Sequence, residues 1–432
     1  MTIVNCQLLT VNWFGGLFLD IWSYTQDGYN VEDIVTNGNR FLIGNGYMGY
    51  RGTMDEWGRR EMVAVNLAGV YDRNGEKWRE PVNAPNGLFM KLSVNGAIVA
   101  LGGAGEHGKT EARSAATARG EATAYSEATA YSASAARSEA AQPVCHSQTI
   151  QFRNGVHIRD TLFPSARIRS ERLASMAQPH LLASNITLSF SSDCDAELTT
   201  GIDTDIWDIN GPHLFDFAYQ TGAVISARAY TGELKIPVEV SQSMRCDFSH
   251  TETQEVGDGV FRHIRFNAKA GATYIISLFA SVYTGQDVDN QQSAAQTLCA
   301  EAAQAGYSAV LTAHEVVWEA LWRNSAVVLT GNDEAARALN ASLYHLHSIA
   351  PRHADALSIP ARGLSGQTYK GAIFWDSEIF LFPFFVHTEP ELAETLLRYR
   401  IQTLPGALRK AAEYGYRGAF YPWESQERGI EG

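Results

Sequence analysis

The sequence lacks any long apolar run and any pattern of an export signal. A helix that crosses a membrane needs about 18 or more nearly uninterrupted apolar residues, and no segment provides them. The N-terminal stretch MTIVNCQLLTVNWFGG has no basic segment followed by an apolar one and a small-residue cleavage site. These absences predict a cytoplasmic protein without a membrane partner.

Positive charge is also scarce. The 432 residues include 34 lysines and arginines against 47 aspartates and glutamates, which gives a formal net charge of -13. Nucleic acid and anionic lipid both attract basic surfaces, so neither is expected as a main partner. A small neutral ligand remains compatible with this charge balance.

Cysteine is sparse and shows neither a metal-binding nor a disulfide pattern. The chain contains no C-x-x-C motif, and no histidine stands at ligand spacing from a cysteine. His345 and His347, two apart on a predicted helix, face different directions and could not share a metal at the usual spacing. We expect no metal site, and reduced, mostly buried thiols at the five scattered cysteines, Cys6, Cys145, Cys194, Cys246 and Cys299.

The first two-thirds of the chain shows the alternating pattern of β-strands. With 45% apolar and 19% charged residues, a chain of this length is expected to form two or more folded domains. In TIQFRNGVHIRD, apolar residues alternate on both sides of Asn154-Gly155, which predicts a hairpin. Similar alternation in MKLSVNGAIVAL and LKIPVEVS predicts an antiparallel β-sandwich domain over residues 1–285.

Residues 102–143 interrupt this pattern with a low-complexity segment. They are rich in alanine, serine, threonine and glutamate and contain a tandem EATAYS repeat. Such a composition buries too little apolar surface to offset the entropy of ordering, so we expect a disordered or weakly helical surface loop. A tolerated loop expansion explains the segment more simply than a regulatory insert, because long surface insertions cost little free energy.

The remaining residues change to a helical period. Residues 286–331 predict two helices separated at Gly306, which form a linker after the β domain. An all-α domain then extends over residues 332–432. Its later helical segments include PELAETLLRYR and LPGALRKAAEYG, and Gly415 closes the second of these.

Two dipeptides in the helical part pair a tryptophan with an acid. Trp375-Asp376 lies in GAIFWDSEIFLFPFF, and Trp423-Glu424 lies in AFYPWES. A pyranose has apolar C–H faces and a rim of hydroxyls, so a tryptophan beside an accepting carboxylate suits one sugar ring. Each dipeptide alone is explained more simply by a tryptophan in the core and an acid at a helix start. Both flank short glycine-bearing connections, which favours a sugar site built from the two together.

Five further stretches stand in order along the chain: GNGYMGYRGTMDE, VYDRNGEKW, HEVVWEALWRNSAVVLTGND, IPARGLSGQTYKGAIFWDSEIFLFPFF and TLPGALRKAAEYGYRGAFYPWES. Together they resemble glycoside hydrolase family 65, a group that includes maltose, trehalose, kojibiose and nigerose phosphorylases. The resemblance covers nearly the whole chain except the low-complexity segment. It implies an N-terminal β-sandwich, a helical linker and the start of an (α/α)6 barrel.

The resemblance also implies an activity and roles for residues. Family members of the phosphorylase type invert the anomeric centre and convert an α-linked glucosyl disaccharide and phosphate into β-glucose 1-phosphate and a free sugar. Trp375 and Asp376 would hold the glucosyl ring, while Trp423 and Glu424 would line the site towards the acceptor sugar. Phosphate would be a co-substrate, no cofactor is implied, and homodimers are common among such enzymes.

The family's general acid is a glutamate in a motif that follows the YPWE segment. It is expected beyond Gly432, as are the phosphate-binding residues. Glu424, Glu427 and Glu431 supply carboxylates, but their surroundings in the sequence do not mark any of them as the acid. The chain is therefore expected to be the N-terminal portion of such an enzyme, with a truncated barrel and no activity alone.

An incomplete barrel has a physical consequence, and two alternatives stay open beside it. Apolar side chains such as Leu381, Phe384 and Phe385 would be exposed where further helices should cover them. One alternative is a family hydrolase of trehalose or kojibiose, which would need a second carboxylate to activate water. The other is a non-catalytic, sugar-binding product of truncation.

Overall fold

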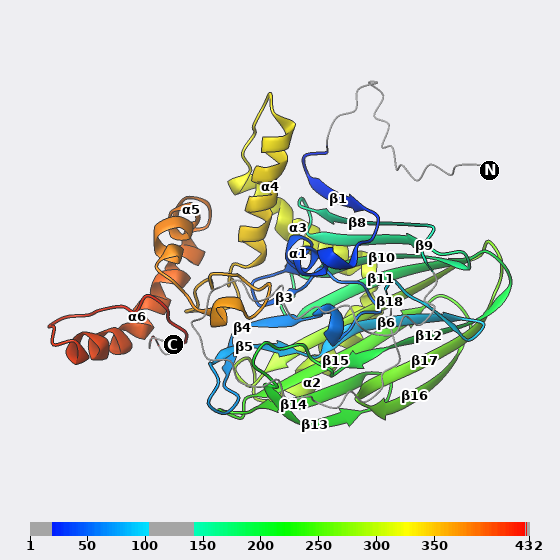
Figure 1. The fold of residues 1–432 in the computed structure, drawn as a ribbon, viewed down its shortest axis with the longest axis horizontal. Coiled ribbons are helices and arrows are strands. Elements are labelled where there is room, and N and C mark those ends of the chain that lie inside the picture. The colour runs from blue at the N-terminus through cyan, green and yellow to red at the C-terminus, as the bar shows by residue number, and fades with distance from the viewer. Residues whose placement is uncertain (1–19, 103–141, 428, 430–432) are drawn as a thin grey trace.

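A computed structural model describes residues 20–102, 142–427 and 429 (Figure 1). The predicted surface loop over 102–143 lies, apart from its ends, outside the described residues, as does Cys6. Among the described part of the chain, strands dominate up to Thr284 and helices follow from Gln291. This order confirms the predicted antiparallel β domain followed by helices.

The described strands form three antiparallel sheets. In spatial order, the largest contains β1 (Ser23–Asp27), β8 (Cys145–Gln151), β9 (Val156–Leu162), β10 (Ala166–Ala174), β11 (Leu181–Phe190), β18 (Thr273–Thr284), β15 (Pro237–Cys246), β14 (Ile225–Thr231) and β13 (Leu214–Gln220). The second contains β16 (Thr251–Gly257), β17 (Gly259–Ala268), β12 (Cys194–Asp203), β6 (Asn86–Val94) and β7 (Ala97–Val99). The third contains β2 (Ile43–Gly44), β3 (Met48–Tyr50), β4 (Val65–Asp72) and β5 (Glu80–Ala84).

The hairpin predicted at Asn154-Gly155 is confirmed. Strands β8 and β9 pair with Gln151 opposite Val156, so the turn spans the four residues between them. Gly155 adopts a left-handed conformation (φ 63°), which glycine reaches without steric cost, and its N–H donates to the Gln151 carbonyl at 2.8 Å. The local sequence therefore sets the register of this edge of the sheet.

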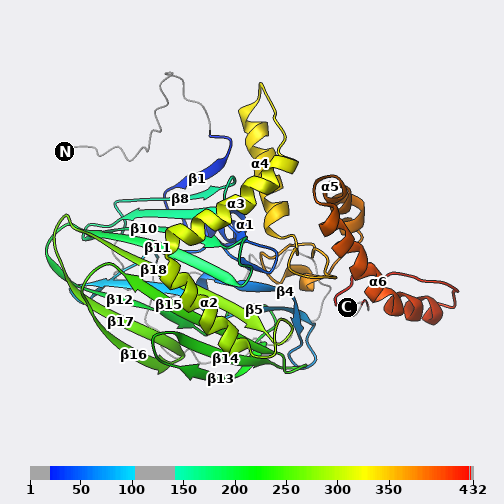
Figure 2. The ribbon, with the colours of Figure 1, turned by 180° about the vertical axis from the view of Figure 1, so that it is seen from behind.

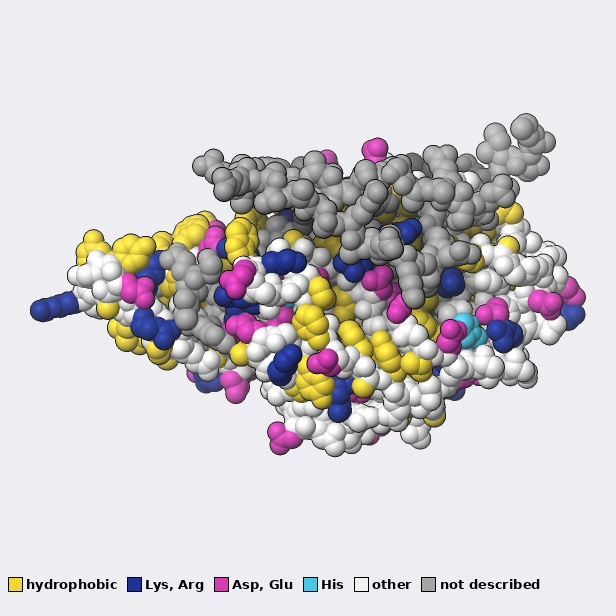
Figure 3. Space-filling model, turned by 60° about the horizontal axis from the view of Figure 1, so that its bottom comes forward, with side chains coloured by type: hydrophobic (Ala, Val, Ile, Leu, Met, Phe, Trp, Pro, Cys, Tyr) yellow, Lys and Arg dark blue, Asp and Glu magenta, His cyan; other side chains and the backbone are white. Residues whose placement is uncertain are grey.

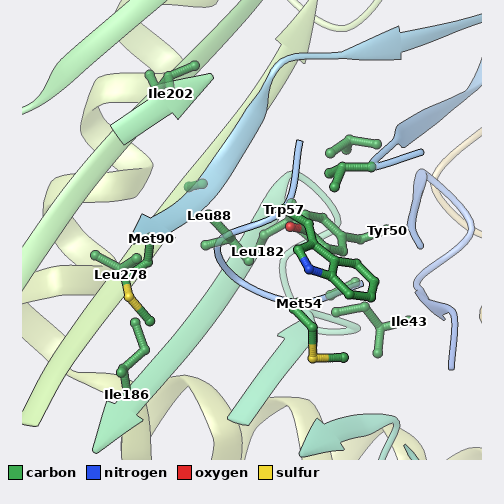
Figure 4. Close-up of a cluster of buried hydrophobic side chains, with 14 of the residues drawn as sticks. Ile43, Tyr50, Met54, Trp57, Leu88, Met90, Leu182, Ile186, Ile202 and Leu278 are labelled. Carbon is green, nitrogen blue, oxygen red and sulfur yellow. The ribbon is translucent and has the colours of Figure 1, made fainter. Parts of the chain in front are cut away.

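The two larger sheets face each other across an apolar core. Ile186 of β11 and Leu278 of β18 point from one sheet towards Leu88 and Met90 of β6 in the other (Figure 4). All four side chains are buried. Removing this apolar surface from water stabilises the sheets against each other, and it is the main reason why the alternating sequence folds as stacked sheets.

A group of charged residues is also buried in this β domain. Arg159 of β9 is fully buried and pairs with Asp55 at 3.0 Å and with Glu56. Arg172 of β10 lies 3.6 Å from Asp55, and the Ser170 hydroxyl donates to the same carboxylate at 2.8 Å. Burial alone would raise the pKa of Asp55, but the two guanidinium groups outweigh it and hold that pKa below its usual value. The cluster is therefore charged and mutually dependent.

Helices cover the outside of the largest sheet and extend away from it. In Figure 2, α2 (Gln291–Ala305) and α3 (Tyr307–Ser325) lie across its outer face, with the break at Gly306 where it was predicted. A short helix, α1 (Ile34–Arg40), and 3-10 turns at Val31–Asp33 and Arg59–Glu61 lie within the β domain. The chain then continues through α4 (Asp333–Ser348), α5 (Phe382–Thr388) and α6 (Pro390–Glu413).

The two helical segments predicted after Thr388 are in fact one helix. Helix α6 runs through Pro405 without a break. An interior proline removes one donor from the ladder and crowds the carbonyl four residues earlier, but burial of Tyr399, Ala407 and Ala411 on the same helix favours the continuous helix. Gly415 follows the end of α6 in a left-handed conformation (φ 76°), as the sequence predicted.

The expected exposure of Leu381, Phe384 and Phe385 is wrong. Phe385 is fully buried and the other two are half-buried, because they pack with each other against the inner side of α6. Other apolar side chains of this region are exposed, and hydrophobic groups gather at the helical end of the molecule in Figure 3. The exposed apolar side chains between residues 377 and 413 include Ile379, Phe380, Leu397, Ile401, Leu404 and Leu408.

Two further observations bear on the sequence predictions. No helix in the described ranges has the length and apolar character needed to span a membrane. The four described cysteines are free thiols. Only Cys299 is buried, whereas the other three are half-buried, so the prediction of mostly buried thiols is wrong.

Candidate functional site

The two tryptophan–acid dipeptides are brought together by a short backbone pairing. Ile373 and Ser425, 52 positions apart, form an isolated antiparallel bridge with N–H···O distances of 2.8 and 3.1 Å. The bridge places the segment before Trp375 beside the segment after Glu424. Two motifs that are distant in sequence therefore lie at one place in the fold.

The two tryptophan rings contact each other and remain partly exposed. Their centroids are 5.1 Å apart at an interplanar angle of 79°, which is an edge-to-face contact. Trp375 is 37% exposed and Trp423 is 48% exposed. The Trp375 indole N–H donates to the Pro422 carbonyl at 2.9 Å, which fixes that ring. Both rings thus present oriented apolar area at the surface.

Asp376 lies next to this aromatic pair at the start of a π-helical turn. The turn spans Ser377–Leu381, with the Phe382 N–H bonded to the Ser377 carbonyl, and leads directly into α5. Such turns are rare and often occur at functional sites. Asp376 is exposed, and within the described residues its carboxylate accepts no hydrogen bond. It retains its full capacity to accept hydrogen bonds from a ligand.

Arg400 of α6 holds the two segments in place. Its Nε and Nη2 donate to the Glu378 carboxylate at 2.9 and 2.6 Å, a bidentate pair. The same guanidinium donates to the Phe374 carbonyl at 3.0 Å and to the Ser425 hydroxyl at 3.2 Å. Glu378 is therefore engaged in positioning, whereas Asp376 is open to a ligand.

The other carboxylates of this region have partners. Glu424 lies 3.6 Å from the Lys370 ammonium. Glu427 pairs with Arg79, which reaches over from the β domain and also binds Glu233 at 2.6 Å. Glu431 lies outside the described residues. Both described glutamates are thus part of ion pairs that join this segment to its surroundings.

The β domain also makes hydrogen bonds with the chain segment just before the site. The Gln367 amide donates to the Pro81 carbonyl at 2.8 Å and to Asp208 at 2.7 Å. Close by, His213 lies 3.2 Å from Asp72 and 2.9 Å from Glu80. These buried contacts connect strands β4 and β5 with the loop that leads to Trp375.

Two groups in this contact have pKa values well above their usual ones. Burial raises the pKa of Asp208 to about 7. Burial by itself would lower the pKa of His213, but its hydrogen bonds to Asp72 and Glu80 outweigh that effect and raise the pKa to about 9. His213 is therefore positively charged at neutral pH and sits between two acids.

Stability should fall as pH rises from about 6.5 to 9. In this window the folded chain retains a proton on His213 that the unfolded chain has lost, so the stabilisation is complete below 6.5 and disappears above 9. The free energy of unfolding should drop by about 3 kcal/mol across the window. Denaturant unfolding at a series of pH values measures it.

His213→Gln should lower stability at pH 6.5 and flatten this slope. Asp208, whose protonated form is favoured in the fold, should add a decline between about pH 4 and 7 in both proteins. His250→Gln, at an exposed histidine of the same domain, is the control and should leave the slope unchanged. An unaltered slope in the His213 variant would contradict the assignment.

Comparison with known proteins decides the family. The family model for the glycosyl hydrolase family 65 N-terminal domain matches residues 24–107 and 137–321. The model for the central catalytic domain of the same family matches residues 340–432. The chain belongs to glycosyl hydrolase family 65. The dipeptides and their bridge thus lie in the part that matches the family's catalytic domain.

Several relatives of this chain are phosphorylases by name, and one is a kojibiose hydrolase of Flavobacterium johnsoniae, 29% identical over 66% of this chain and 43% of the relative. Nigerose phosphorylase of Lachnoclostridium phytofermentans is 38% identical over 439 residues, covering 95% of this chain and 53% of the relative. The 1,2-alpha-glucosylglycerol phosphorylase of Bacillus selenitireducens is 32% identical, covering 95% of this chain and 49% of its own length. The chain spans about half the length of the curated relatives that it matches.

A solved structure has the same fold. It is a human-microbiome protein assigned provisionally as a kojibiose phosphorylase. It superposes with a TM-score of 0.77 at 17% identity, over 95% of this chain and 52% of that structure. The similarity supports a β domain followed by helices as the architecture of these residues.

The sequence patterns did not identify several residues that shape the site. Arg400 lies in the middle of a helical pattern, and none of its neighbours indicates that it binds two separate segments of the site. The Lys370 ammonium lies over the ring of Trp78, which is about 290 positions away in the sequence, and periodicity gives no signal for such a contact. Trp78 alone carried a weak signal, since a large aromatic stands in the polar turn GEKWRE.

Proposed function

We propose that these residues serve an inverting phosphorylase of α-linked glucosyl disaccharides. In this reaction phosphate attacks the anomeric carbon, the glycosidic bond breaks, and β-glucose 1-phosphate and a free sugar are formed. Phosphate is already an anionic nucleophile, so the enzyme needs one acid to protonate the leaving oxygen and no second carboxylate to activate water. The names of the relatives support this proposal.

The observation that best supports this proposal is the exposed carboxylate of Asp376 beside two exposed tryptophans. We assign Asp376 to bind hydroxyls of the glucosyl ring, with Trp375 packing against its C–H face. Trp423 and Glu424 would line the side of the acceptor sugar. The bridge at Ile373 supports this division, because it holds the two dipeptides in one wall.

The domain roles follow from the same proposal. Residues 1–285 form the β domain, 286–331 the linker, and 332–432 the first helices of an (α/α)6 barrel. None of the described carboxylates is assigned as the general acid, since Glu424 and Glu427 are held in ion pairs. We therefore expect no turnover from the 432-residue chain by itself.

The proposal is tested by ligand binding to the purified chain. Wild-type protein should bind glucose weakly, and Asp376→Asn should weaken that binding by about tenfold or more, because hydrogen bonds to a charged acceptor are lost. Isothermal titration calorimetry with glucose measures both constants. Asp355→Asn, at an exposed carboxylate of a nearby loop, is the matched control and should bind as the wild type does.

Equal affinity in the wild type and in Asp376→Asn would contradict the assigned site. The same preparation should also be incubated with nigerose, kojibiose, maltose and trehalose, with and without phosphate. Glucose 1-phosphate that depends on phosphate would place the acid within these residues. Glucose released without phosphate would instead indicate a hydrolase.

A further inference from the structure

The β domain extends to the edge of the candidate site through the connection between β4 and β5. Trp78, in this connection, is 55% exposed. The Lys370 ammonium lies 4.0 Å from the centroid of its ring, a cation–π contact. The same ammonium is 3.6 Å from the Glu424 carboxylate. Lys370 therefore joins a tryptophan of the β domain to the acid of the second dipeptide.

Lys370 sits in an unusual backbone turn. Tyr369, Lys370 and Gly371 all have positive φ, at 57°, 58° and 60°. Left-handed conformations are unfavourable for residues with a Cβ, and they persist where surrounding structure holds them, often at ligand sites. Here the Tyr71 hydroxyl donates to the Gly371 carbonyl at 2.8 Å, and the Gln426 amide donates to the Lys370 carbonyl at 2.7 Å.

A purely structural turn would be served better by another glycine. Glycine at position 370 would adopt the same φ without steric cost. The strained backbone instead presents a long cationic side chain, and that side chain contacts Trp78 and Glu424. The lysine at position 370 therefore makes two contacts that a glycine in the same turn would lack.

We infer that Trp78, oriented by Lys370, is a stacking surface for the second sugar ring of a disaccharide. This inference rests on the proposed function and adds the β domain to the acceptor side of the same site. Lys370 covers part of the indole, while more than half of the Trp78 side chain stays accessible for the C–H face of a pyranose. The ammonium and Glu424 offer a donor and an acceptor to its hydroxyls.

Comparing a one-ring with a two-ring ligand isolates this contact. Trp78→Ala should leave the dissociation constant for glucose unchanged and weaken binding of nigerose and kojibiose by roughly three- to tenfold. Trp78→Phe keeps an aromatic face and should retain most of the affinity. Tyr416→Ala, at another exposed aromatic of the helical region, is the control and should bind both classes normally.

Lys370→Gly separates a ligand role from a structural one. Because glycine relieves the left-handed backbone, the melting temperature should not fall below that of the wild type. Disaccharide binding should nevertheless weaken several-fold while glucose binding is kept. A residue that only supported the fold would show the opposite pattern, with lower thermal stability and equal loss for both ligands.

The outcomes also distinguish this inference from the proposed function. If Asp376→Asn abolishes binding while Trp78→Ala binds nigerose and kojibiose as the wild type does, the glucosyl site stands and the Trp78 surface is refuted. If the wild-type chain binds neither glucose nor disaccharides, both proposals fail. A selective loss of disaccharide affinity in Trp78→Ala and Lys370→Gly, without unfolding, supports the inference.

Discussion

Replacing Arg159 by methionine should destabilise the β domain by about 3–5 kcal/mol, because two buried acids would lose their main counter-charge. Arg159 and its partners Asp55 and Glu56 are all buried. Methionine fills much of the same volume but supplies neither charge nor donors, so the acids must remain uncompensated or take up protons. The free energy of unfolding, measured with urea at neutral pH, reports the loss.

The control is an ion pair of the same kind at the surface. Arg265 of β17 binds Glu197 of β12 at 2.8 Å, and the two side chains are 54% and 34% exposed. Arg265→Met should therefore cost no more than about 1 kcal/mol, since water already screens the pair. If both variants lost the same stability, burial would not be the source of the Arg159 effect.

Gly371→Ala should cost about 2–5 kcal/mol and disturb the site. Alanine at φ 60° carries a left-handed penalty of about 1–2 kcal/mol, and its Cβ would overlap Pro81 of β5, which adds about 1–3 kcal/mol of overpacking. The turn would have to move away from the β domain. Denaturant unfolding gives the cost, and tryptophan fluorescence reports the environment of the site.

Gly415→Ala is the matched comparison for this change. Gly415 also has a left-handed φ, of 76°, but a Cβ there would meet no atom within 4 Å. It should show only the conformational penalty. The difference between the two variants therefore measures the overlap with Pro81, and a difference near zero would contradict the close packing described for Gly371.

Local patterns predicted the local structure well. The hairpin at Asn154-Gly155, the helix break at Gly306 and the end of α6 near Gly415 each depend on glycine conformations that neighbouring residues reveal. Pro405 misled the prediction because the cost of a proline depends on how the rest of the helix packs. Phe385 misled it for a related reason, since its burial depends on packing against α6 as well as on its own segment.

The sequence predicted which residue types form the candidate site, but not the contacts that bring them together. The composition of the two dipeptides indicated a sugar ring, and the resemblance to the family supplied their roles. No sequence feature near Ile373 or Ser425 indicates that they pair, because a single bridge has no periodic pattern. Contacts such as those of Lys370 with Trp78 arise from tertiary packing, which the sequence encodes only through the whole fold.

The long-range pair between Arg79 and Glu427 has a consequence for the order of assembly during synthesis. Its partners are 348 positions apart. At about 5–20 residues per second, Glu427 is translated roughly 20–70 s after Arg79. Arg79 can pair with Glu233 first, and it can pair with Glu427 only after the later helices have been synthesised. A ribosome that pauses between these two points would hold a nascent β domain whose edge beside the candidate site is still unfinished.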